Sequence, residues 1–466
     1  MVFSSFSFLL VFFPAVCLCY FLIPQRFRGA RNLVLLAFSL FFYFWGEARG
    51  VLLMLAVVAV SYLSAIVIGK AGEKRLLRRL GLWLELLVCL GALIYFKYAG
   101  WLLDTANSLL GTKLPVLQVV MPIGISFFTF QSMSYVFDVY KGKVEPQKNI
   151  LYVALYVSLF PQLVAGPIVR YETVAAEIVS RQENLDDLYA GLQRFIMGLG
   201  KKLLLANAFG REAETIFAMS SAVRTAPTAW VGAIAYSLQI YFDFSAYSDM
   251  AIGMGRMFGF HFLENFNYPY AASSVTDFWR RWHISLSSWF RDYVYIPLGG
   301  NRRGLPRQIL NLFAVWALTG LWHGASWNFV LWGLYYFVLL ILEKLFLGRV
   351  LRKLPAAVGR LCTLTAVVLG WTIFNCTEPG QLGAYFRDLF SFRGDFGYAL
   401  LTLRQNVPEF VFGLALCTPL PLRLFRSKPD KPWAELLRCV WLLAVLALSV
   451  LALTGSSFNA FIYFRF

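Results

Sequence analysis

Charged side chains are scarce in this sequence. They make up 14% of the 466 residues, whereas hydrophobic residues make up 59%. Soluble domains average about 25% charged residues, so this composition excludes an ordinary soluble globular protein. It predicts an all-α membrane protein, and the length allows roughly a dozen spanning or half-spanning segments of ~20 residues each.

Acidic residues are fewer than basic ones, 25 against 42, which gives a net charge of +17. This excess does not indicate nucleic acid binding, because the basic residues lie in short loops between apolar runs. Arg26, Arg28 and Arg31 follow the first apolar segment, and a second basic loop at 70–79 follows the third. Cytoplasmic loops are enriched in Lys and Arg, so we expect both loops in the cytoplasm and the N-terminus outside. An anionic ligand or partner on the same side is compatible with this orientation.

Other features that often organise a chain are missing. The seven cysteines show no metal-ligand spacing, and we interpret them as small buried hydrophobic residues. We find no convincing internal repeat, which disfavours an inverted-repeat transporter, and no low-complexity linker or separate soluble domain. The sequence therefore predicts one membrane domain over 1–466, with a motif-rich core at about 115–347 and further spans and an aromatic tail at 357–466.

The stretch at 259–308 is polar, aromatic and basic, and it is too long for an ordinary connection. We expect it to form re-entrant or interfacial helices. Helical spacing in "VTDFWRRWHISLSSWF" (275–290) predicts an ion pair between Asp277 and Arg281 and places Trp279 on the same face as His283.

Arginines give this stretch a dense basic surface near the membrane. One interpretation is an interfacial segment that contacts anionic lipid. The other is a surface that binds an anionic acyl donor, since guanidinium groups suit the phosphates of coenzyme A or an acidic carrier protein. The candidate donor-binding residues are Trp279, Arg280, Arg281, Arg291, Asn301 and Arg302.

Histidine is the scarcest titratable residue, with three in the chain. His323 lies in "TGLWHGASWN" (319–328), directly after an apolar run. Ionisable residues within a membrane are costly and usually face a cavity or pathway, and imidazole can take up a proton near neutral pH. Gly320 and Gly324 would allow another segment or a substrate to approach closely. A buried structural histidine is the alternative interpretation.

A second polar group, formed by Asp243, Ser245 and Asp249, lies within the apolar segment 229–258. These residues are candidates to line the wall of a passage. A network of hydrogen bonds that packs helices together is an equally good interpretation.

Six blocks of the sequence together resemble the membrane-bound O-acyltransferase (MBOAT) superfamily, and most closely its bacterial AlgI-like alginate O-acetyltransferase branch. They occur in family order over nearly the whole chain: "PIGISFFTFQSMSYVFDVYKG" (122–142), "FPQLVAGPIVR" (160–170), "YFDFSAYSDMAIG" (241–253), "ENFNYPY" (264–270), "TDFWRRWHISLSSWFRDYVYIPLGGN" (276–301) and "GLWHGASWNFVLWG" (320–333).

The resemblance implies a multispanning MBOAT helical bundle around a central tunnel. His323 falls on the family's expected catalytic histidine, and His283 is similar to a second functional histidine on the cytoplasmic side. Gln131 and Trp322 lie in matching blocks, and we expect them to support the tunnel. His261 matches no catalytic block and is interpreted as an interfacial residue.

The ending "FIYFRF" (461–466) resembles the aromatic-tyrosine tail of AlgI-type proteins and of a small protein that accompanies D-alanyl-transferring members. The resemblance implies that Tyr463 carries the acyl group covalently. Arg465 departs from the glutamine or aspartate expected at its position. An aromatic belt with one snorkelling arginine is the alternative.

The implied function is transfer of an acyl group, most simply acetyl, from a cytoplasmic thioester across a bacterial cytoplasmic (inner) membrane to an exported polysaccharide or cell-wall glycan. The donor would be acetyl-CoA or an acyl carrier protein, no metal is required, and an extracytoplasmic hydrolase-like partner would complete the transfer. Three alternatives remain: D-alanyl transfer to teichoic acid, a transporter or channel that uses Asp243 and Asp249, and a non-enzymatic scaffold.

Overall fold

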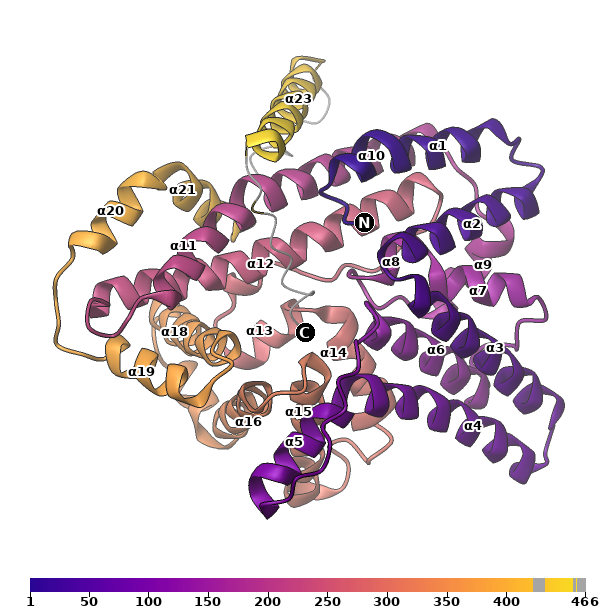
Figure 1. Ribbon diagram of the computed structural model, residues 1–466. Coiled ribbons are helices and arrows are strands. Elements are labelled where there is room, and N and C mark those ends of the chain that lie inside the picture. The colour runs from indigo at the N-terminus through magenta and orange to yellow at the C-terminus, as the bar shows by residue number, and fades with distance from the viewer. Residues whose placement is uncertain (422–431, 456–457, 459–466) are drawn as a thin grey trace. The chain divides into compact units, whose positions relative to one another are not determined.

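The computed structural model describes residues 1–421, 432–455 and 458 (Figure 1). The described residues form helices joined by turns and loops, without β-strands, which confirms the prediction of an all-α protein. The chain divides into two compact units. The first contains residues 1–195 and 250–263, and the second contains 196–249 and 264–466. Tyr463 and Arg465 lie outside the described residues.

The first unit consists of antiparallel helices from the N-terminal part of the chain (Figure 1). Its helices α2, α3, α4 and α6 pack side by side, and α7 and α9 pack against them. The elements are η1 (Ser7–Phe12), α1 (Phe13–Leu22), α2 (Arg28–Gly46), α3 (Ala48–Lys70), α4 (Arg75–Leu93), η2 (Ile94–Tyr98), α5 (Ala99–Leu110), α6 (Ile125–Tyr140), α7 (Ile150–Ser158), α8 (Phe160–Leu163), α9 (Tyr171–Ser180) and the start of α10 (Leu185–Gly200).

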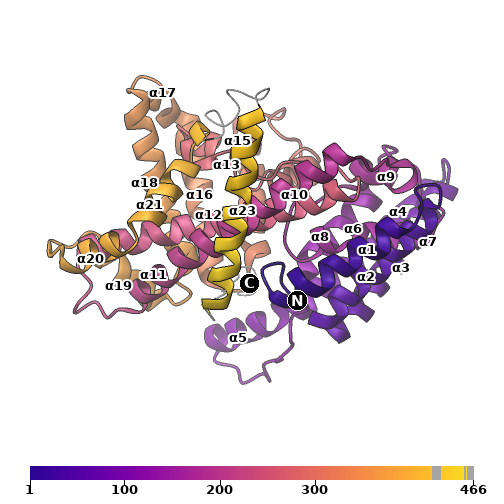
Figure 2. The ribbon, with the colours of Figure 1, turned by 90° about the horizontal axis from the view of Figure 1, so that it is seen from above.

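The second unit contains both candidate catalytic histidines. Helix α16 lies between α15 and α18 (Figures 1 and 2), and Trp332, Tyr336 and Trp371 are fully buried in its core. The elements are η3 (Lys201–Ala206), α11 (Asn207–Ala218), α12 (Ala226–Met257), η4 (Pro269–Ala271), α13 (Val275–Arg281), α14 (Ile284–Phe290), η5 (Arg291–Tyr295), α15 (Gly304–His323), α16 (Trp327–Leu342), η6 (Glu343–Leu347), α17 (Gly348–Leu351), α18 (Ala356–Asn375), α19 (Pro379–Leu389), α20 (Gly397–Gln405), α21 (Val407–Leu416) and α23 (Pro432–Gly455).

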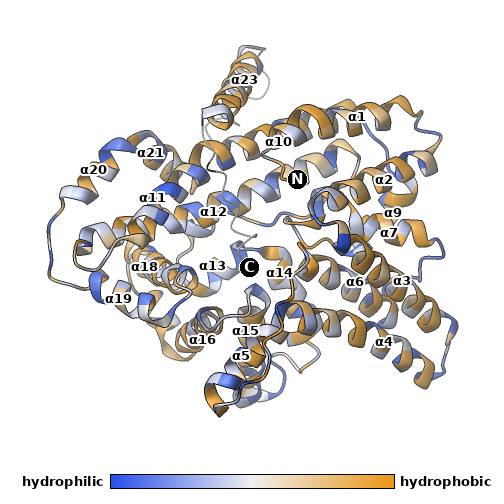
Figure 3. Ribbon diagram, in the orientation of Figure 1, coloured by the Kyte–Doolittle hydropathy of each residue, from blue (hydrophilic) through white to orange (hydrophobic). Residues whose placement is uncertain are grey.

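Six helical segments among the described residues are long and apolar enough to cross a membrane: 28–46, 48–70, 75–110, 327–351, 356–375 and 432–455. Their outer faces carry large hydrophobic side chains, such as Leu52 and Leu443, which are 72% and 65% exposed. Helices α3, α4 and α23 are accordingly hydrophobic along most of their length (Figure 3). Exposed apolar surface of this extent is stable when it faces lipid, so the chain is a multi-pass membrane protein.

The polar stretch at 259–308 folds into the short helices η4, α13, α14 and η5 and the start of α15, and the re-entrant or interfacial location expected for it stays a prediction. Asp277 and Arg281 form the predicted ion pair, with 2.9 Å between Oδ1 and Nε. The prediction that Trp279 and His283 lie on one continuous helix is wrong. Helix α13 ends at Arg281, Trp282 is extended, and His283 has a left-handed backbone with φ 44° and ψ 55°.

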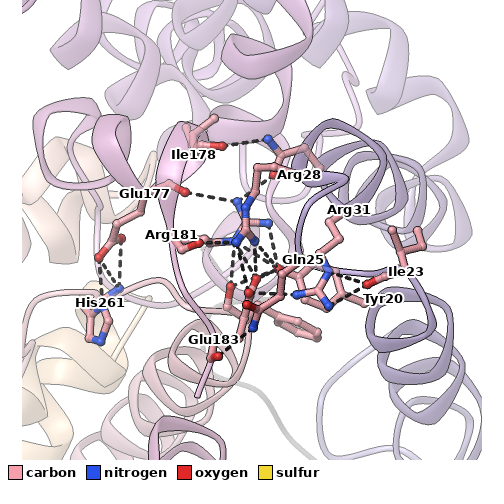
Figure 4. Close-up of polar contacts among 12 residues, drawn as sticks. Tyr20, Ile23, Gln25, Arg28, Arg31, Glu177, Ile178, Arg181, Glu183 and His261 are labelled. Atoms are coloured by element: carbon pink, nitrogen blue, oxygen red, sulfur yellow. Dashed lines mark hydrogen bonds and ion pairs between the residues drawn. The ribbon is translucent and has the colours of Figure 1, made fainter. Parts of the chain in front are cut away.

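A polar cluster joins the ends of several helices in the first unit (Figure 4). The Glu183 carboxylate, with only 5% of its side chain exposed, accepts hydrogen bonds from Tyr20 and Arg28 and lies 2.8 Å from Nη1 of Arg31. The buried Arg181 guanidinium donates to the Tyr20 hydroxyl and to the Phe258 carbonyl oxygen. The cluster therefore connects α1, α2, α9 and the segment after α12 within this unit.

His261 is exposed on the surface of the same unit, and its expected interfacial location stays a prediction. Its Nδ1 is 2.8 Å from Oε1 of Glu177, and its Nε2 is 3.6 Å from Oδ2 of Asp187. Arg256 donates to the other oxygen of Asp187 at 2.6 Å. These contacts connect α9, α10 and the end of α12, so His261 takes part in linking helix ends.

We predict that Glu183→Ala destabilises the protein by about 3 kcal/mol, because it leaves buried arginines without their carboxylate. Burial alone would raise the pKa of Glu183, but the hydrogen bonds from Arg28 and Tyr20 outweigh burial and lower it. A lowered carboxyl pKa stabilises the folded state above the unfolded value of about 4.3. The free energy of unfolding of wild type should therefore exceed that of Glu183→Gln by the full amount at neutral pH. This difference in stability should shrink as the pH falls below about 4.

The measurement is thermal unfolding of the detergent-purified protein across pH. The matched control is Glu172→Gln, which removes a carboxylate that is 39% exposed and 3.7 Å from its arginine. Equal melting temperatures for the Glu183 and Glu172 variants would contradict the prediction.

Candidate active site

The second unit encloses a cavity of about 300 Å³ that is lined from α13, α14, η5, α15 and α16. His283 and His323, which are 40 positions apart in the sequence, both line it. The remaining walls are mainly aromatic and aliphatic, including Trp316, Leu312 and Phe290. The fold therefore brings the two predicted histidines to one apolar, partly enclosed space.

His323 is the last residue of α15 and is 8% exposed. Its ring makes edge-to-face contacts with Trp322, Trp332 and Phe374 at centroid distances of 4.9, 5.0 and 5.2 Å. Residues from α15, α16 and α18 thus hold the imidazole on several sides. Aromatic edges and faces of this kind fix the ring plane without neutralising its nitrogen atoms.

The glycines beside His323 admit the neighbouring helix. A Cβ atom on Gly320 would lie 2.5 Å from the Phe329 carbonyl oxygen, and one on Gly333 would lie 2.5 Å from the Trp316 carbonyl oxygen. A Cβ on Gly324 would lie 2.3 Å from the Phe329 ring. The predicted close approach at Gly320 and Gly324 is therefore made by α16, and it positions the end of α15.

His283 lies in the connection between α13 and α14 and is 2% exposed. Its Nδ1 is 3.1 Å from Oδ1 of Asn265. The ring packs edge-on against Phe244 at 4.6 Å and lies 5.8 Å from the Trp322 ring. Since Trp322 also contacts His323, one indole packs against both histidines, and its expected part in a tunnel stays a prediction.

The candidate donor-binding residues fall into two groups. Trp279, Arg280 and Arg291 line the cavity, whereas Arg281, Asn301 and Arg302 do not. Arg280 is exposed at its edge, and Arg291, paired with Asp292 at 2.7 Å, keeps 63% of its side chain exposed. Two solvent-exposed guanidinium groups therefore stand beside an apolar cavity, which suits a ligand with an anionic end and a neutral end.

The acidic residues of α12 are engaged in ion pairs. Lys202 lies 2.8 Å from Oδ1 of Asp243, with both side chains 1% exposed, and Lys201 lies 2.7 Å from Oδ2 of Asp249. These pairs fasten η3 to α12. Neither aspartate lines the cavity, and neither does the buried Ser245. The contacts favour helix packing, and a role in a passage stays a prediction.

Gln131 is fully buried on α6 in the first unit. Its backbone carbonyl accepts hydrogen bonds from Ser134 and Tyr156, and its expected part in a tunnel stays a prediction. Sequence reasoning assigned no role to Asn265, although this residue lies in the quoted block "ENFNYPY". Its contact with His283 follows from the fold and could not be read from spacing.

Two imidazoles at one apolar cavity are suited to proton transfer during a group-transfer reaction. Among the described residues, no three His, Cys, Asp or Glu side chains gather as metal ligands would. The fold and the cavity together are those expected of a membrane-embedded enzyme that transfers a chemical group.

Comparison with known proteins specifies the kind of transferase. The model of the membrane-bound O-acyltransferase family matches residues 124–356. The chain is 36% identical to a probable alginate O-acetylase AlgI of Azotobacter vinelandii over the whole of both proteins. It is 32% identical to a peptidoglycan O-acetyltransferase of Helicobacter pylori, covering 88% of this chain and 83% of the relative. A teichoic acid D-alanyltransferase of Bacillus subtilis is 28% identical over 53% of this chain and 65% of the relative.

The protein therefore belongs to the membrane-bound O-acyltransferase family and is an O-acyltransferase, as the sequence blocks predicted. The family match covers α13 to α16, and with them both histidines and the cavity.

We predict that Gly320→Ala lowers stability by about 1–3 kcal/mol, because its methyl group would collide with the backbone of α16 rather than with a flexible side chain. Gly383→Ala is the matched control, since Gly383 also lies in a helix of the second unit and a Cβ there meets nothing within 4 Å. Removing a helical glycine at such an open position should stabilise by ~0.5–1 kcal/mol. Thermal unfolding of both variants in detergent measures the difference, and a Gly320 variant as stable as wild type would refute the close crossing.

Proposed function

We propose that this O-acyltransferase moves an acyl group, most simply acetyl, from a cytoplasmic thioester to a hydroxyl group of an extracytoplasmic polysaccharide or cell-wall glycan. The observation that carries the proposal is the single cavity that holds both His283 and His323 beside exposed arginines. The acceptors named for the relatives are alginate, peptidoglycan and teichoic acid, which supports a glycan as the acceptor here.

The donor would bind with its thioester in the cavity and its anionic portion outside. Ligand pockets usually measure about 300–1,000 Å³, so a cavity of about 300 Å³ suits a small acyl group on a thiol arm and disfavours a long fatty acyl chain. Arg280 and Arg291 would bind the phosphates of acetyl-CoA or the acidic surface of a carrier protein. Trp279 would form the cavity wall beside them, since its ring makes edge-to-face contacts with Trp316 and Tyr336 at a centroid distance of 4.8 Å.

His323 would remove the proton of the accepting hydroxyl group, and His283 would assist from the donor side. With Tyr463 as an intermediate acceptor, the acyl group would pass from a thiol with a pKa of ~8.5 to a phenol of ~10. It would then pass to a sugar hydroxyl, whose pKa lies near that of water and far above that of the phenol. In each transfer the group that departs has a lower pKa than the hydroxyl group that becomes acylated, so the departing group is the better leaving group.

Tyr463 follows Phe458 by five residues, and the Phe458 carbonyl oxygen accepts a hydrogen bond from Asn207 in the second unit. The protein would lie in a bacterial cytoplasmic (inner) membrane with its N-terminus outside, and a hydrolase-like partner outside the cytoplasm would complete the transfer. D-alanyl transfer from a carrier protein is the second candidate, supported by the D-alanyltransferase relative.

The test is incubation of the purified protein with acetyl-CoA that carries a labelled acetyl group. We expect label to remain bound to the denatured protein and to be released by hydroxylamine. Removing a general base typically costs about 10²–10⁴-fold in rate, so His323→Ala should abolish labelling, and Tyr463→Phe should remove its attachment point. His261→Ala is the matched control, because it removes a surface histidine of the first unit. Wild-type labelling in both the His323 and Tyr463 variants would reject the mechanism, and labelling by a D-alanyl carrier protein alone would select the second candidate.

The arginine assignment has a separate test. Arg280→Ala and Arg291→Ala should each raise KM for acetyl-CoA roughly tenfold, the loss of about 1.4 kcal/mol from one charged contact, with little change in kcat. Arg404→Ala is the control, since Arg404 is an exposed arginine of α20 that does not line the cavity. Steady-state kinetics of all three variants would measure this rise in KM. An equal KM for the three would exclude donor binding by Arg280 and Arg291.

A further inference from the structure

The backbone of His283 is unusual. Its φ of 44° and ψ of 55° lie in the left-handed region, which is disfavoured for residues with a Cβ atom. Among the described residues other than glycine, it shares a positive φ with Tyr268 alone. Backbone outliers of this kind persist where surrounding contacts hold them, and they often occur at functional sites.

Asn265 supplies those contacts from the opposite side of the connection. Its backbone carbonyl oxygen accepts from the N–H of Ile284 at 3.0 Å. Its side-chain Oδ1 accepts from the backbone N–H of Ser285 at 3.2 Å and from the Ser285 hydroxyl at 2.9 Å. Asn265 is fully buried, so its backbone and side chain together clamp the two residues that follow His283.

The same amide oxygen determines the protonation of the imidazole. A backbone N–H can only donate, so the atom of Asn265 that faces Ser285 must be the oxygen and not the NH₂ group. That oxygen lies 3.1 Å from Nδ1 of His283. An amide oxygen can only accept, so Nδ1 must carry the hydrogen. The Ser285 hydroxyl, at 3.4 Å from Nδ1, is the more distant neighbour and does not change this assignment.

The other ring nitrogen is then the reactive one. In a neutral imidazole with hydrogen on Nδ1, Nε2 carries the lone pair. Nε2 of His283 is buried without a hydrogen-bond partner among the described residues, and His283 lines the cavity. A buried acceptor without a partner is costly, and a bound molecule with an O–H or S–H group would satisfy it.

We propose that Asn265 is a positioning residue that holds His283 as the Nδ1–H tautomer and presents Nε2 to the cavity as a proton acceptor. The part of this inference that concerns turnover rests on the proposed function. A proton would pass from a hydroxyl, thiol or water in the cavity to Nε2, which gives an imidazolium with hydrogen on both nitrogens. The imidazolium would later return that proton to the departing oxygen or sulfur, so that His283 ends each cycle unchanged.

The direct test is nitrogen-15 NMR of the full-length protein with labelled histidine. The chain has three histidines, so His261→Gln and His283→Gln suffice to assign the His283 signals. In the wild type we expect a hydrogen-bearing Nδ1 and a lone-pair Nε2 at a pH where the ring is neutral. Hydrogen on Nε2 instead would overturn the proposal, and this result needs no substrate.

Substitutions at Asn265 test whether the amide is the cause. Asn265→Asp keeps an acceptor of the same shape and should keep the Nδ1–H tautomer, whereas Asn265→Leu has no acceptor and should give a mixture or the Nε2–H form. If the leucine variant does not fold, the wild-type and aspartate spectra still decide. A leucine variant that folds and retains the wild-type tautomer would show that Asn265 does not set it.

The pH profile of acyl transfer gives an independent measurement. A carboxylate beside Nδ1 stabilises the imidazolium, so Asn265→Asp should move the acidic limb of activity about one pH unit or more to higher pH. Asn406→Asp is the control, because the Asn406 amide, directly after α20, donates to the Thr402 carbonyl oxygen of that helix, and its acidic limb should not move. Measurable transfer with an unmoved limb in Asn265→Asp would reject the proposal and leave the proposed function intact. Absence of transfer in the wild type would reject that function, while the NMR result stands.

Discussion

The close crossing of α15 and α16 is the constraint on which the site depends. At Gly320 and Gly333 each helix meets the backbone of the other, with no room for a Cβ atom. This crossing brings Trp332 against the His323 ring, and α18 adds Phe374 on another side. The hydrophobic effect does not drive helices together in lipid, so close van der Waals packing at small residues supplies much of the attraction between them. The position of His323 is therefore a consequence of backbone contact, which leaves little freedom for the end of α15 to move.

The second histidine is held by a different principle. His283 lies in a break between two short helices, where hydrogen bonds from neighbouring residues to Asn265 replace the helical pattern. Rigid packing fixes one imidazole and a polar clamp fixes the other, and both face the same cavity. Catalytic groups are most effective when their orientation is fixed before the substrate binds. The cavity walls around them are mainly apolar, and a polar contact in such surroundings is stronger than in bulk water.

The sequence predicted the parts of this arrangement that depend on local pattern. Composition gave the membrane class, helical spacing gave the Asp277–Arg281 pair, and the rarity of histidine directed attention to His323. The break at Trp282 could not be predicted, because "TDFWRRWHISLSSWF" continues a helical pattern and contains no glycine or proline. What stabilises the break is Asn265, 18 positions before His283. A tertiary contact thus overrode local propensity at the candidate site, and conflicts of this kind are expected at functional sites.

The acidic residues of α12 bear on the choice between an enzyme and a transporter. A transporter needs intramembrane carboxylates that bind and release a cation, and Asp243 and Asp249 were the candidates for that role. In the structure, Lys201 forms an ion pair with Asp249 and Lys202 forms one with Asp243. The Lys202–Asp243 pair is almost completely buried. An ammonium group fixed at such a distance occupies the place that a transported cation would need, and removing it would leave a costly unpaired charge. These contacts favour a role of the two carboxylates in joining η3 to α12 over a role in cation transport.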